Sequence, residues 1–190
     1  MALPATDDFN RANADPIGGN WTTQTGASAW RVFGSSAYVS TGGSAPWCAY
    51  WNADSFNSDQ YCQATGNEIN NVPAGPSIRI QTGDSVVNCY QMCPRGSTTQ
   101  RMFEYNSGTP TQLGADFSES ITTASVIKIR GETSTLTFSV DGGDIGTRTD
   151  STHTGGSAGL SASVDQGFDN WEAGNVSSGI TIEVPTGPLR

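Results

Sequence analysis

The chain has 190 residues, of which 35% are hydrophobic and only 14% charged, and its formal net charge is −9. This length suits one all-β domain, and the charge argues against nucleic acid and anionic membranes as partners, because both attract clustered Lys and Arg side chains. Lys128 is the only lysine. No apolar run approaches the roughly 20 residues of a membrane span.

Short segments typical of strands follow one another along the chain, separated by turns rich in small and polar residues. They cover residues 29–33, 37–40, 47–51, 59–65, 76–81, 86–92, 100–105, 125–130, 135–141, 157–163, 170–176 and 180–184. We expect a hairpin turn at residues 141–144 and a polar loop at 147–157. About twelve short strands in one domain predict an all-β fold, a two-sheet antiparallel jelly-roll sandwich. Its core is expected over residues 6–184, followed by a short C-terminal tail.

The clearest hairpin joins residues 125–130 to residues 135–141. Leu136, Phe138 and Val140 alternate with hydroxyl-bearing residues, which predicts a strand with one buried face. The residues expected to face outward are Thr135, Thr137 and Ser139.

The two ends of the chain carry matching signatures of Asp and aromatic residues. Asp-Asp-Phe-Asn-Arg occupies residues 7–11, and Phe-Asp-Asn-Trp-Glu occupies residues 168–172. Signatures of this kind indicate that the first and last strands pair and close one sheet around both termini.

Several segments carry a family resemblance, and together they extend over residues 7–175. They are Asp-Phe-Asn-Arg at 8–11 with Gly-Asn-Trp at 19–21, Asp-Gln-Tyr at 59–61, Leu-Thr-Phe-Ser-Val-Asp-Gly at 136–142, Gly-Ser-Ala-Gly-Leu at 156–160 and Phe-Asp-Asn-Trp-Glu-Ala-Gly at 168–174. In order and spacing they resemble the concanavalin A-like lectin/glucanase superfamily, in the laminin-G-like branch found in phage and bacterial surface proteins. The resemblance implies a two-sheet sandwich and often glycan binding.

Catalysis is the weakest of the function classes that this resemblance allows. A retaining glycosidase needs two carboxyl groups about 5 Å apart. The glucanases of the superfamily carry Glu-x-Asp-x-x-Glu on one strand, and no such motif occurs here, since every glutamate is isolated. We therefore expect a non-catalytic protein, with a glycoside hydrolase as the less favoured alternative. The single histidine, His153, is expected to be exposed in a loop.

Three carboxylates near the chain ends are candidates for a structural Ca²⁺ site: Asp7, Asp8 and Asp169. Related sandwiches often hold calcium near such termini, and Ca²⁺ takes roughly six to eight oxygen ligands. The alternative is that Asp8 and Asn170 cap turns by accepting backbone hydrogen bonds.

The aromatic residues bear on sugar binding, because sugar rings stack on exposed Trp or Tyr faces. Trp47, Tyr50 and Trp51 lie within five residues, so they cannot all point to one face of a strand. They are our candidates for a glycan-binding or subunit-interface surface. The alternative is core filling with one ordinary half-exposed ring. The remaining tryptophans are expected in the core: Trp21, Trp30 and Trp171.

The cysteines of the chain are Cys48, Cys62, Cys89 and Cys93. They predict up to two disulfides or free buried thiols. Cys89 and Cys93 would lie about 13 Å apart in an extended strand, too far to bridge each other unless a bulge or turn intervenes. Each is therefore expected to pair with Cys48 or Cys62. Zinc is disfavoured because the spacing lacks paired Cys-x2-Cys motifs.

Two functions compete at this stage. The first is a virion structural or decoration protein held by other virion or surface proteins, which the low lysine content and the lack of a signal peptide at residue 1 favour. The second is an adhesion module for cell-surface glycan, which the aromatic cluster favours. Both place the protein on a virion or an extracellular surface, and a homo-oligomer is compatible with either. No cofactor beyond the candidate calcium is expected.

Overall fold

The computed structural model of the chain describes residues 3–24, 30–39, 47–66, 74–162 and 166–177. Within these ranges the regular structure consists of sixteen β-strands without a helix, which confirms the predicted all-β class. The described part accordingly offers no helix with the length and apolar character needed to cross a membrane.

The strands divide into two sheets of eight strands each. Sheet A contains β1 (Ala5–Asp7), β3 (Trp30–Val32), β4 (Ala37–Val39), β6 (Gln60–Gly66), β12 (Val126–Glu132), β13 (Thr135–Val140), β14 (Gly143–Thr149) and β16 (Gly167–Asn175). Sheet B contains β2 (Trp21–Thr23), β5 (Trp47–Trp51), β7 (Ala74–Ile80), β8 (Cys89–Pro94), β9 (Thr99–Asn106), β10 (Thr109–Gln112), β11 (Phe117–Ser118) and β15 (Ser157–Ala162).

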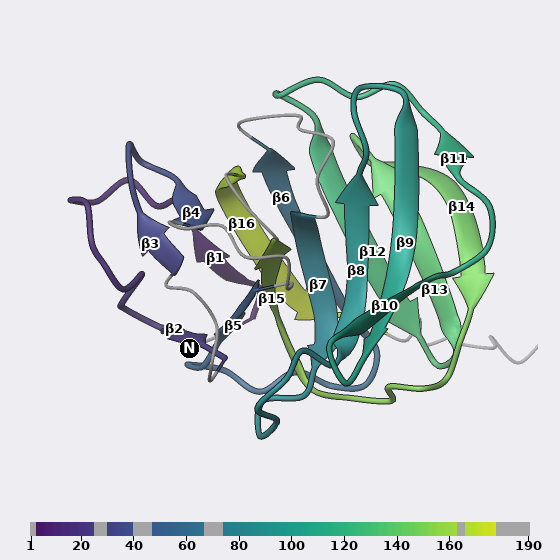
Figure 1. The fold of residues 1–190 in the computed structure, drawn as a ribbon, viewed down its shortest axis with the longest axis horizontal. Coiled ribbons are helices and arrows are strands. Elements are labelled where there is room, and N and C mark those ends of the chain that lie inside the picture. Colours follow the sequence, from purple (N-terminus) through teal and green to yellow (C-terminus); the bar gives the residue numbers. More distant parts are fainter. Residues whose placement is uncertain (1–2, 25–29, 40–46, 67–73, 163–165, 178–190) are drawn as a thin grey trace, which may run out of the picture.

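The strand order in sheet A is β14-β13-β12-β6-β16-β4-β3, with β1 paired to β16. The order in sheet B is β10-β9-β8-β7-β15-β5-β2, with β11 paired to β9. All of these pairings are antiparallel, and in Figure 1 strands β7, β8 and β9 lie in front of β12 and β13 as a second layer. The predicted two-sheet jelly-roll sandwich is therefore confirmed.

The predicted pairing of the chain ends is confirmed as well. Strand β1 runs antiparallel to β16, with Ala5 opposite Ala173 and Asp7 opposite Trp171. The last predicted strand, residues 180–184, lies outside the described residues.

The core between the sheets is rich in aromatic rings near this closure. Trp21, Trp51 and Trp171 meet with ring centroids 4.7–5.6 Å apart. Trp21 and Trp171 are buried as predicted, and so is Trp30. Each such ring pair stabilises the folded state by about 0.5–1.5 kcal/mol beyond the effect of burying its area. The cluster therefore packs both ends of the chain against β5.

Strand β13 combines a confirmed prediction with a wrong one. Leu136, Phe138 and Val140 are buried, as their alternation predicts. Thr137 and Ser139 were expected to face solvent, yet each is only 3% exposed. The Ser139 hydroxyl donates to the Asp144 side chain at 2.6 Å across the β13–β14 hairpin, so a polar contact from the neighbouring strand accompanies its burial.

Strand β14 corrects the expectation of a polar loop from residue 147. The strand continues to Thr149, which lies opposite Thr135 of β13. Because β14 is an edge strand with mostly exposed residues, backbone pairing rather than apolar alternation defines it.

Candidate functional site

Three connections meet at one end of sheet B. Strands β5 and β7 both end beside the start of β15, because Tyr50 lies opposite Gly159 and Ile80 lies opposite Ser157. The chain leaving β5, the β7–β8 connection and the segment that precedes β15 are thereby brought together, at the lower end of the sheet in Figure 1.

The first hollow at this end, which we name the aromatic hollow, has a volume of about 360 Å³. Tyr50 and Phe56 are half-buried in it, and Asn52 and Thr82 are exposed at its rim. Its full lining is Tyr50, Trp51, Asn52, Asp54, Ser55, Phe56, Thr82, Gly156 and Ser157. Aromatic surface surrounded by a few polar groups is the usual composition of a small-ligand site.

The structure separates the three aromatic candidates. Tyr50 packs its ring partly against a small cluster that includes Ile80, while its remaining surface borders the hollow. Trp51 is only 4% exposed, stacks on Trp171 and donates its indole N–H to Asp54 at 2.8 Å, so its ring faces the core. Trp47, at the other end of β5, packs partly against the core and does not line the hollow.

A second hollow, the polar hollow, has a volume of about 480 Å³. Its lining is Gln81, Asp84, Asn88, Asn106, Thr152, His153, Thr154 and Gly155. The Asn88 side-chain amide donates a hydrogen bond to Asp84 and accepts one from the backbone N–H of Ser107, which fixes the orientation of the Asn88 side chain in this hollow. Asn106, Thr152 and Thr154 are exposed at the rim.

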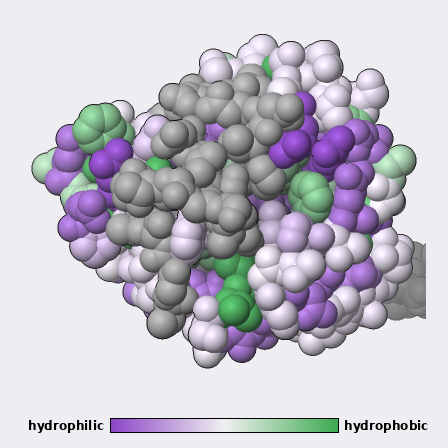
Figure 2. Space-filling view, viewed as in Figure 1, coloured by the Kyte–Doolittle hydropathy of each residue, from purple (hydrophilic) through white to green (hydrophobic). Residues whose placement is uncertain are grey.

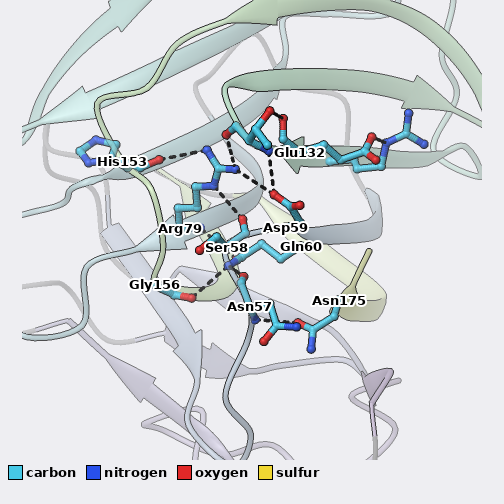
Figure 3. Close-up of polar contacts among 11 residues, drawn as sticks. Asn57, Ser58, Asp59, Gln60, Arg79, Glu132, His153, Gly156 and Asn175 are labelled. Atoms are coloured by element: carbon cyan, nitrogen blue, oxygen red, sulfur yellow. Dashed lines mark hydrogen bonds and ion pairs between the residues drawn. The ribbon is translucent and has the colours of Figure 1, made fainter. Parts of the chain in front are cut away.

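The segment between the two hollows is fixed by three side chains that donate hydrogen bonds to its backbone carbonyls. Arg79 donates to the His153 carbonyl at 3.0 Å, and Gln60 donates to the Gly156 carbonyl at 3.1 Å (Figure 3). Gln81 donates to the carbonyl of the intervening Gly155. Since these donors come from β6, β7 and the residue after β7, the segment between the hollows is attached to both sheets.

Arg79 is the hub of this arrangement. Its guanidinium also donates to the carbonyls of Ser58 at 3.0 Å and Thr133 at 2.7 Å, and its side chain is fully buried. Burial lowers the pKa of Arg79, while the nearby Tyr90 and Asp59 oppose that change. Asp59 lies 4.0 Å away as the nearest carboxylate (Figure 3). The arginine therefore holds loops rather than binding a ligand.

His153 corrects the expectation of an exposed loop histidine, because it is only 7% exposed. Its backbone N–H donates to the Tyr90 hydroxyl, and its Nε2 lies 2.8 Å from the Tyr105 carbonyl. A carbonyl only accepts, so Nε2 carries a proton. Glu104 lies 3.3 Å from the same nitrogen. The residue closes the loop over β8 and β9 and leaves one edge at the polar hollow.

The calcium candidates do not form a cluster of ligands. Both oxygens of Asp7 accept hydrogen bonds, Oδ1 from the Phe9 N–H and the Arg11 guanidinium and Oδ2 from the Trp21 indole. Asp8 accepts from the Asn10 N–H, which lowers its pKa.

Asp169 accepts the N–H of Asn170 inside β16, where the register with β6 shifts between Asp169 and Glu172. Within the described residues there is no group of three His, Cys, Asp or Glu side chains arranged to hold a metal. The Asp8 contact agrees with the turn-capping alternative, whereas Asn170 lies within β16, and the calcium site stays a prediction.

The four cysteines are present as free, buried thiols, and no two of them are bridged in the structure. This arrangement agrees with the alternative of free buried thiols, and the disulfides stay a prediction. The neighbouring Cys89 thiol and burial raise the pKa of Cys48 well above its ordinary value. Burial raises the pKa of Cys62 to about 12 and that of Cys93 to about 11.

Two of the sequence candidates, Tyr50 and Trp51, line the aromatic hollow, and sequence reasoning missed most of the other residues around the two hollows. Phe56 stands alone among polar residues, Arg79 and Asn88 lie inside predicted strands, and Asn106 directly follows one. No local pattern marks them, because their neighbours come from distant strands.

The two antiparallel sheets, closed by the pairing of the chain ends, define a concanavalin A-like jelly roll. Carbohydrate-binding module CBM66 from Bacillus subtilis matches with a TM-score of 0.61 and 19% identity, over 82% of this chain and 96% of that one. A β-1,3-1,4-glucanase (lichenase) from a mouse hindgut metagenome matches with a TM-score of 0.59 and 8% identity, over 90% and 99%.

The carbohydrate recognition domain of Emp46p matches with a TM-score of 0.51 and 13% identity, over 83% of this chain and 89% of that one. No family model and no curated protein matches the sequence. At these identities the similarity shows the fold alone, and the laminin-G-like branch stays a prediction.

Proposed function

We propose that this protein is a non-catalytic glycan-binding module whose site is the aromatic hollow. The observation that carries the proposal is the composition of that hollow, where the half-buried rings of Tyr50 and Phe56 lie beside the exposed polar side chains of Asn52 and Thr82. The C–H face of a sugar ring packs on an aromatic ring, and its hydroxyls hydrogen-bond to amide and hydroxyl groups.

Binding without hydrolysis is favoured by the carboxylates that line the hollows. The aromatic hollow has one, Asp54, which accepts the Trp51 indole N–H. The polar hollow also has one carboxylate, Asp84, which accepts a hydrogen bond from the Asn88 side-chain amide. A glycosidase requires an acid and a second carboxylate facing the same bond, so single engaged carboxylates support a binding role.

The surface character supports a polar ligand. Figure 2 shows hydrophilic to neutral colours over most of the coloured part of this face, with small hydrophobic areas. In the described part of the chain the exposed large hydrophobic residues are Phe33 and Val86. The two solved binding modules above are described as binding or recognising carbohydrate, which agrees with the proposal. Attachment to a virion or a cell surface rests on the sequence alone.

The proposal is tested with a glycan array, followed by titration calorimetry of the glycans that bind. Tyr50→Ala and Phe56→Ala should each weaken binding about tenfold or more, which corresponds to about 1.4 kcal/mol. Tyr50→Phe keeps the ring and should bind nearly as the parent does. Phe33→Ala removes an exposed ring elsewhere, at the turn after β3, and is the matched control. Binding that survives both alanine variants, or reducing ends released from a bound glycan, would contradict the proposal.

A further inference from the structure

The aromatic and polar hollows are neighbours along two segments of the chain. Gln81 lines the polar hollow and the next residue, Thr82, lines the aromatic hollow. In the same way Gly155 lines the polar hollow and Gly156 lines the aromatic one. The two hollows therefore lie on opposite sides of one ridge built from these residues.

The segment that precedes β15 contributes two glycines to the ridge. A Cβ on Gly156 would lie 2.5 Å from the Ile80 carbonyl oxygen, and its φ of 132° is one that L-residues rarely adopt. This position therefore requires glycine, because a side chain there would run into the backbone of β7. A Cβ on Gly155 would meet only Ser58 Oγ at 3.9 Å, so that position is open.

The ridge is also preorganised. The carbonyls of His153, Gly155 and Gly156 are each held by a side chain donor, as described above. A ligand that crosses the ridge meets a surface whose conformation does not have to be ordered on binding, which preserves affinity.

The charges around the two hollows define the class of ligand. Their linings contain Asp54 and Asp84 but neither Lys nor Arg. The neighbouring Arg79 is buried, and its guanidinium donates its hydrogen bonds to backbone carbonyls. A sugar that carries a carboxylate or sulfate would meet negative charge without a cationic partner, whereas a neutral sugar offers hydroxyls to amides and hydroxyls.

We propose that the two hollows are consecutive subsites for one neutral oligosaccharide chain, which passes over the glycine ridge. This inference rests on the proposed glycan binding. One sugar ring stacks in the aromatic hollow, and a following sugar hydrogen-bonds in the polar hollow with Asn106 and Thr154 at its rim. Affinity then depends on chain length and on the absence of anionic groups.

The test is titration calorimetry of the whole protein with neutral gluco-, manno-, xylo- and galacto-oligosaccharides of increasing length. Oligogalacturonides serve as the anionic series. The expected result is an increase in affinity of about tenfold or more from the monosaccharide to the longer chains of one neutral series, with weaker binding of the uronides.

Two variants act on the second subsite alone. The first is the double variant Asn106→Ala/Thr154→Ala, which removes two polar groups from the rim of the polar hollow. The second is Gly155→Leu, which places a large side chain on the ridge. Each should abolish the gain with chain length and leave monosaccharide affinity within about twofold, while Tyr50→Ala should weaken every length. A thermal melt identifies a variant that fails to fold, and the other variant then carries the test.

The outcomes separate this inference from the proposed function. Chain-length dependence that both variants leave intact, no dependence on length, or uronides that bind as tightly as neutral chains would overturn the two-subsite proposal. Under each of these results the loss of binding in Tyr50→Ala would still support the aromatic hollow as a glycan site. No binding to any of the series would overturn both.

Discussion

Replacing Arg79 with Met should destabilise the protein strongly, because the guanidinium serves three backbone carbonyls at once. Those carbonyls belong to Ser58, Thr133 and His153, at 2.7–3.0 Å. The methionine fills much of the same volume but donates no hydrogen bond, so the carbonyls lose their partner.

The magnitude follows from how accessible each carbonyl is. A buried acceptor that loses its donor costs about 1–3 kcal/mol. The bond to His153 is buried, whereas the bonds to Ser58 and Thr133 are partly buried and water replaces the donor there at lower cost. We expect the free energy of unfolding to fall by about 3–5 kcal/mol, near the upper end for a single substitution.

The assay is urea unfolding followed by tryptophan fluorescence. Arg79→Lys keeps the charge, but one ammonium does not reach carbonyls in three directions, so most of the loss should remain. Arg101→Met is the matched control, since Arg101 makes a two-bond ion pair with Asp116 at the surface and should change stability little. A loss below about 1 kcal/mol for Arg79→Met, or full recovery with lysine, would refute the hub role.

Two further predictions concern the cysteines and the calcium candidates. The native thiols should react slowly with a thiol reagent at mildly alkaline pH, because raised pKa values of about 12 for Cys62 and about 11 for Cys93 keep them protonated. After unfolding without reductant all four should react, and fewer than four would reveal a disulfide. Adding Ca²⁺ or EDTA should leave the melting temperature unchanged, because hydrogen bonds occupy both oxygens of Asp7. A calcium-dependent rise that Asp169→Asn abolishes would contradict this expectation and support the predicted calcium site.

Part of the site was within reach of the sequence. The crowding of three aromatic rings in residues 47–51 correctly indicates that they divide between two faces of a strand. Which ring points outward depends on what packs against β5. Trp51 stacks on Trp171 of β16 in the core, and Tyr50 borders the hollow.

The sequence by itself determined the class of the fold and the pairing of the chain ends. Alternation at Leu136, Phe138 and Val140 specifies a half-buried strand, and the signatures at the two ends predict the pairing of β1 with β16. The alternation is a short-range pattern, since a strand places every second side chain on one face. The pairing of the ends was instead predicted from matching signatures at the two ends of the chain.

Only the tertiary structure decided the burial of His153 and the assembly of the two hollows. The contacts of His153 come from β8 and β9, more than forty residues away in the chain. The hollows exist because the register of β5, β7 and β15 ends these strands at one level, which gathers Phe56, Thr82 and Gly156. Register between distant strands is set by the packing of the whole sandwich, so no local pattern encodes it.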